Sequence, residues 1–124
     1  MDKKFEILDH TADIGIIAYG EDLKKAFENA ASGMFSLITD LTGIVNDQTR
    51  KIDIGSPDRE SLLVSWLNEL IYLFDVENLI FGKFDIIYLD DNALSAIAYG
   101  EKVDLSRHEI RTGIKAATYH MLKI

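Results

Sequence analysis

The stretch LDHTADIG, residues 8–15, places two carboxylates and an imidazole within five positions of the chain. These residues are Asp9, His10 and Asp13. Carboxylates with oxygen-rich neighbours suit calcium, magnesium or manganese better than zinc. Short acidic side chains also accept hydrogen bonds from turn amides, and an imidazole can bond a backbone carbonyl. The spacing therefore leaves a divalent-metal site and an ordinary polar turn both open.

A second polar set lies near the end of the sequence, where His108 and His120 accompany Glu101, Asp104 and Lys115. A lone histidine is more often structural than catalytic, and no serine near either histidine carries a nucleophile motif, so we expect no hydrolytic triad. The lysine can bury its stem and meet a carboxylate, or lie on the surface. The chain has no cysteine, which excludes thiolate zinc sites and cysteine nucleophiles.

Strand patterns flank the first polar set. Residues 5–7 alternate apolar and charged side chains, and residues 14–19 are apolar on both faces, which predicts an outer strand followed by a buried one. The acidic cluster then lies in or beside the turn between them. The tetrapeptide Ala-Tyr-Gly-Glu occurs at 18–21 and again at 98–101, and we expect its glycine to end a strand each time.

Two long helices are predicted. Asp22 can cap the first, which has apolar residues at helical spacing and ends near Thr39. The second begins at Ser56-Pro57-Asp58, with Ser56 as the capping hydroxyl, and its apolar stripe continues to Phe74. Further strands are expected around 44–54 and in a hairpin of 84–89 with 94–99. Residues 116–122 form either a final strand or a helix. This pattern predicts an α+β fold with two layers, in which a mostly antiparallel sheet packs with two long helices.

The length and net charge of the chain indicate which kinds of binding partner suit it. The 124 residues suit one domain. The net charge of −8 argues against nucleic-acid binding, because that affinity comes largely from lysine and arginine contacts with phosphates. A basic protein or a cation suits this surface better. No signal peptide is evident, and no apolar run approaches the ~20 residues that span a bilayer, so we expect no membrane contact and a cytoplasmic location.

Four blocks of sequence, in order along the chain, resemble the archease family. They are His10–Gly15, residues 26–31 with Gly33–Phe35, Leu63–Leu70 and Ile114–His120. The resemblance extends from residue 5 to the last residue. It implies a single archease-like domain over residues 1–124 that is not itself an enzyme.

The resemblance also implies a function. Archeases are protein cofactors of the RNA-splicing ligase in tRNA splicing, which they activate by promoting its guanylylation with GTP and its multiple turnover. By analogy, Asp13 is a metal-binding carboxylate that ligase activation needs, Lys115 occupies the matching position of the second activating element, and His10 is a candidate group supporting the metal ligand. The implied metal is calcium, with magnesium or manganese as alternatives.

Other functions remain open at this point. The family also suggests a chaperone or specificity modulator of a tRNA cytosine methyltransferase. A metal-dependent hydrolase would need a metal, a general base and a substrate pocket within this chain. A general chaperone would use an exposed apolar patch.

The end of the sequence departs from the family pattern. Family members continue into another strand that ends on Phe-Asp-Ile or Phe-Asp-Val, whose aspartate completes the metal site. Here the sequence ends at Leu122-Lys123-Ile124. We therefore expect the final C-terminal strand to be lacking. A single carboxylate supplies too few of the ~6 to 8 oxygens that calcium prefers, so metal binding is expected to be weak or absent.

Overall fold

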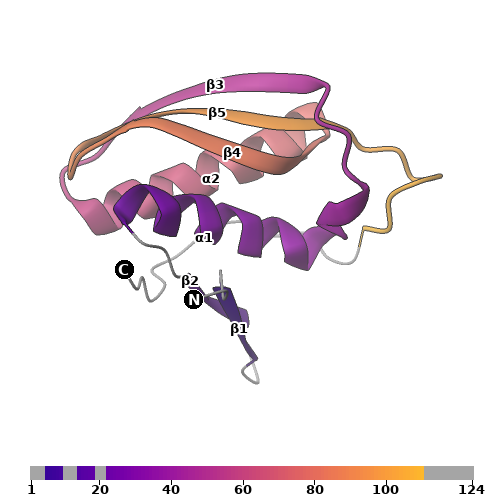
Figure 1. The fold of residues 1–124 in the computed structure, drawn as a ribbon, viewed down its shortest axis with the longest axis horizontal. Coiled ribbons are helices and arrows are strands. Elements are labelled where there is room, and N and C mark those ends of the chain that lie inside the picture. The colour runs from indigo at the N-terminus through magenta and orange to yellow at the C-terminus, as the bar shows by residue number, and fades with distance from the viewer. Residues whose placement is uncertain (1–4, 10–13, 19–21, 111–124) are drawn as a thin grey trace.

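The computed structural model describes residues 5–9, 14–18 and 22–110, with the first two ranges described at the level of the backbone. Its elements are β1 (Phe5–Asp9), β2 (Ile14–Ala18), α1 (Leu23–Ile38), η1 (Leu41–Gly43), β3 (Gln48–Gly55), α2 (Arg59–Glu77), β4 (Leu79–Leu89) and β5 (Ala93–Lys102). The antiparallel strands β3, β5 and β4 form one sheet in that order, and β1 pairs with β2. Both helices lie on one face of the sheet, and the β1–β2 hairpin lies against α1 (Figure 1). The predicted α+β class is confirmed.

The first helix begins where the sequence predicts. The carboxylate of Asp22 accepts a hydrogen bond from the Lys25 amide at 2.9 Å, which satisfies one of the free donors at the start of α1. The helix ends at Ile38, and the buried Thr39 follows it.

The start of α2 corrects the prediction for Ser56. The N-cap is Asp58, whose carboxylate accepts from the Ser61 amide at 2.7 Å. The side-chain amide of Asn92 donates to the carbonyls of Ser56 and Pro57, at 3.1 and 2.9 Å, and so holds both residues outside the helix. Ser56 therefore caps nothing, because the chain turns into the helix two residues later.

The β4–β5 hairpin is confirmed, and it is longer than predicted. Its turn is fixed by Asp90, whose carboxylate accepts from the amides of Asn92 and Ala93, at 2.8 Å each. Gly100 lies inside β5 and does not end it, so the strand-ending prediction is wrong at this position. A Cβ atom on Gly100 would lie 1.9 Å from the Ile80 carbonyl oxygen, so the glycine permits close approach of β4.

The core fills the space between the sheet and the two helices. Phe35 packs edge-on against Phe81, with ring centroids 5.7 Å apart, and Trp66 packs against Phe84 at 5.9 Å. The buried indole of Trp66 donates to the Phe27 carbonyl at 3.0 Å and so ties α2 to α1. No helix in the described part of the chain is long and apolar enough to cross a membrane.

The strand predicted around 44–54 begins later than expected. β3 starts at Gln48, while Ile44 follows η1 and Val45 is exposed. The Val45 amide donates to a side chain instead of a neighbouring strand. That side chain is the carboxylate of Glu101, at the end of β5.

Candidate functional site

The residues predicted to carry chemistry fall mostly outside the described ranges. Asp13, His10, Lys115 and His120 belong to segments that the structure does not describe. The strands on either side of the first segment are described, and they pair from Phe5 opposite Ala18 to Asp9 opposite Ile14. The two strands predicted on either side of residues 10–13 are therefore confirmed, and the structure adds that they pair antiparallel. The roles of Asp13, His10 and Lys115 stay predictions.

The second polar set comes together around Glu101, which is only 7% exposed. One carboxylate oxygen, Oε2, accepts from the Val45 amide at 2.7 Å and lies 3.1 Å from Nε2 of His108. The other oxygen, Oε1, forms an ion pair with the guanidinium of Arg107. The carboxylate thus joins the end of β5, the segment before β3 and the loop after β5.

The hydrogen bonds of His108 define its tautomer. The ring is buried, and its Nδ1 accepts a hydrogen bond from the Asp104 amide at 2.8 Å. A ring nitrogen that accepts carries no proton, so the imidazole is neutral and its proton is on Nε2, facing Glu101. Both ring nitrogens are therefore engaged within the protein.

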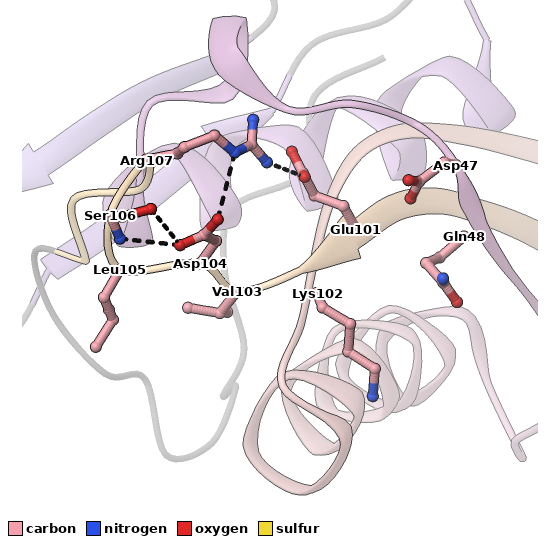
Figure 2. Close-up of a pocket in the computed structure, with 9 residues that line it drawn as sticks. All are labelled: Asp47, Gln48, Glu101, Lys102, Val103, Asp104, Leu105, Ser106 and Arg107. Atoms are coloured by element: carbon pink, nitrogen blue, oxygen red, sulfur yellow. Dashed lines mark hydrogen bonds and ion pairs between the residues drawn. The ribbon is translucent and has the colours of Figure 1, made fainter.

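Asp104 shapes the loop that brings these groups together. Its carboxylate accepts from the amide and the hydroxyl of Ser106, at 3.0 and 2.6 Å, and its carbonyl accepts from the amides of Arg107 and His108. Figure 2 shows Arg107 extending between the carboxylates of Asp104 and Glu101. The loop borders an open pocket of about 680 Å³.

The electrostatics of the cluster keep its carboxylates ionised. Burial acts to raise the pKa of Glu101, but the Val45 amide, the His108 ring and the Arg107 charge outweigh it, so the pKa lies below its ordinary value. The hydroxyl and amide of Ser106 lower the pKa of Asp104. Both acids are therefore negatively charged at neutral pH.

The cluster is suited to fixing the chain and poorly suited to chemistry. Each oxygen of Glu101 and each ring nitrogen of His108 already has a partner inside the protein. A metal ion at His108 would have to displace one of its hydrogen bonds, and a cation at Glu101 would meet the positive charge of Arg107. Across the described residues, no group of three histidine, aspartate or glutamate side chains could hold an ion. This geometry supports a structural role for His108, not a catalytic one.

Sequence reasoning grouped His108 with Glu101 and Asp104 but missed Arg107 and Val45. The Asp-x-Ser pattern at 104–106 is a local signal for a side-chain-stabilised turn, which could have placed Arg107 beside the histidine. The Val45 amide is 56 residues from Glu101 in the sequence, and no local pattern predicts such a contact.

Comparison with known proteins identifies the family. The model of the Archease protein family (MTH1598/TM1083) matches residues 5–124. The chain belongs to the archease family. It is similar to the protein archease of Methanosarcina mazei, with 44% identity over 98% of this chain and 86% of that protein. It is also similar to the protein archease of Sulfurisphaera tokodaii, with 44% identity over 98% of this chain and 88% of that relative.

A solved archease-like fold supports the architecture. The solution structure of Methanobacterium thermoautotrophicum protein 1598 superimposes with a TM-score of 0.78 and is 44% identical, covering 95% of this chain and 86% of the other. The family resemblance drawn from the four sequence blocks is therefore confirmed.

Proposed function

We propose that this chain is a non-enzymatic protein cofactor of an RNA-splicing ligase, and that it promotes guanylylation of the ligase with GTP and repeated turnover during tRNA splicing. The observation that carries the proposal is the family match, which spans both Asp13 and Lys115. Within the described residues, the buried Glu101 and His108 are bonded to other groups of the protein, so the proposal assigns them a structural role.

Asp13 and Lys115 are the proposed activating residues, and His10 supports the first of them. The proposed metal is calcium, with magnesium or manganese as alternatives. Among the described residues, no group of three histidine, aspartate or glutamate side chains could hold it. We therefore propose metal binding at Asp13 alone.

A protein cofactor can accelerate a partner by binding its competent conformation more tightly than the other. A preference of ~3 kcal/mol would shift that equilibrium by more than a hundredfold. The net charge of −8 favours encounter with a basic, RNA-binding enzyme. Stimulation should therefore decline as salt screens this attraction.

The direct test is GTP-dependent guanylylation of a purified ligase with substoichiometric amounts of this protein. Asp13→Ala and Lys115→Ala should each abolish most of the stimulation. Asp85→Ala and Lys83→Ala are matched controls, because both side chains are exposed on β4, and they should stimulate like the parent chain. Full stimulation by both Asp13→Ala and Lys115→Ala would refute the assignment, and turnover without ligase would favour a hydrolase.

Metal binding needs its own measurement. Because Asp13 alone supplies few ligand oxygens, binding is expected to be weak. Calcium titrated in large excess into ¹⁵N-labelled protein should shift amides next to residues 10–13 and leave those of Val45 and Asp104 unmoved. The Asp13→Ala variant should lose the shifts. If calcium instead moved the Val45 and Asp104 amides, the ion would bind at Glu101 and the proposed location would be wrong.

A further inference from the structure

The two outer strands of the main sheet, β4 and β3, differ in what lies along their outer edges. The outer edge of β4 is contacted by α1 at residues 86 and 87, where Glu28 accepts from the Ile86 amide at 3.0 Å and Lys24 donates to the Ile87 carbonyl at 3.3 Å. In the described part of the chain, β3 pairs with β5 alone. A strand edge with free amides and carbonyls can pair with another strand.

The hydrogen bonds around β5 show which residues of β3 face outward. The Ser56 amide donates to the Asn92 carbonyl, and on the opposite side of β5 the Ala93 carbonyl accepts from the Asp90 amide. In an antiparallel ladder the amide and carbonyl of one residue point the same way and alternate along the strand. The even-numbered residues of β3 therefore bond to β5, and residues 49, 51, 53 and 55 present their backbone groups to the open edge. The Thr49 carbonyl accepts from the Arg50 guanidinium at 2.7 Å, so the open stretch of this edge is centred on residues 51–55.

The side chains of these edge residues carry opposite charges. Lys51 and Asp53 are 69% and 62% exposed, with Nζ and Oδ2 3.9 Å apart in the same chain. A lysine on an edge strand normally discourages pairing with a second strand. Asp53, two residues later, has the opposite charge. In one antiparallel arrangement of two copies, the lysine of each copy therefore lies opposite the aspartate of the other.

A pair related by a two-fold axis must place odd-numbered residues opposite odd-numbered residues. Of the registers that overlap most of β3, one sets Lys51 opposite Lys51 of the second copy and another sets Asp53 opposite Asp53, and like charges in these positions repel. The register centred on Ile52 sets each Lys51 opposite Asp53 of the other copy. The charges therefore select a single register.

We propose that β3 is a self-association edge, and that two copies of this chain pair antiparallel about Ile52 into one continuous sheet. Such an interface is isologous and uses the same edge of both copies, so it closes as a dimer. The α1 contacts at Ile86 and Ile87 oppose the addition of a further strand to β4. The proposal does not depend on the ligase function.

The test is sedimentation velocity from micromolar to millimolar protein, which should show a concentration-dependent species of twice the 14.0 kDa monomer mass. Lys51→Asp or Asp53→Lys replaces two attractive pairs by two repulsive ones and should raise the dissociation constant at least about tenfold. The double swap Lys51→Asp/Asp53→Lys restores opposite charges and should return the constant to within about threefold of the parent value. Asp85→Lys makes the same charge change on β4, away from the open edge, and should have no effect.

Three results would overturn the proposal. The protein could remain monomeric up to millimolar concentration, or dimerise equally well with either single reversal. The amides of Lys51 and Asp53 could also be protected from hydrogen exchange in the dilute monomer, which would mean that another part of the same chain already covers this edge.

Discussion

Replacing Glu101 with glutamine tests whether the cluster at the end of β5 holds the loop of residues 103–110 in place. The substitution keeps the size of the side chain but exchanges one acceptor oxygen for an amide donor. In one orientation the new NH₂ group faces Arg107, and in the other it faces the donors of Val45 and His108. Either way, donors face donors in a site that is nearly closed to water.

The expected cost follows from these contacts. Hydrogen bonds to charged groups contribute about 1.5–3 kcal/mol each, and breaking a buried charge pair costs several kcal/mol, so Glu101→Gln should lower the free energy of unfolding by about 2–4 kcal/mol. The corresponding fall in Tm is roughly 10 °C for a domain of this size. Urea unfolding followed by circular dichroism measures the loss, and the control is Glu60→Gln, an exposed acid in the first turn of α2.

The pH dependence gives an independent check. Because the folded-state pKa of Glu101 lies below its ordinary value of 4.5, its contribution to stability is complete above that value and is lost as the pH falls through the folded pKa. The stability difference between the parent chain and Glu101→Gln should therefore be constant near neutrality and shrink in acid. A variant as stable as Glu60→Gln at neutral pH would refute the reasoning.

Two packing predictions can be measured by the same unfolding assay. Gly100→Ala would place a Cβ atom 1.9 Å from the Ile80 carbonyl oxygen and should separate β4 from β5, giving little folded protein, whereas Gly43→Ala has open space around its Cβ position and should fold normally. Trp66→Phe removes the indole donor from the buried Phe27 carbonyl, and should cost about 1–3 kcal/mol; a smaller loss would mean that water replaces the missing donor.

Local signals in the sequence predicted the elements but not their contacts. The Asp22 cap, the apolar stripe of α2 and the turn at Asp90 each depend on residues a few positions apart, and all three are confirmed. The error at Ser56 arose because Asn92, from a distant turn, holds that residue outside the helix. The error at Gly100 has the same origin, because its neighbour Ile80 lies on another strand.

The same limit applies to the candidate site. Sequence proximity grouped Glu101, Asp104 and His108, since all three lie within eight residues. It could not show that the Val45 amide occupies one carboxylate oxygen, or that the Asp104 amide fixes the tautomer of His108. Those contacts decide whether an acid beside a histidine is available for chemistry.

In this protein, a binding site differs from a structural cluster in whether its polar atoms already have hydrogen-bond partners inside the protein. An acid and a histidine occur together twice in the sequence, once at Asp9 to Asp13 and once at Glu101 to His108, and composition does not distinguish them. In the second pair, Glu101 and His108 both form hydrogen bonds inside the protein. These bonds join β5 to the loop after it and to the segment before β3. An ion or a partner enzyme needs ligand atoms without such partners. The proposed ligase-activating role therefore requires the carboxylate of Asp13 to be unlike that of Glu101, with its oxygens directed away from its own backbone.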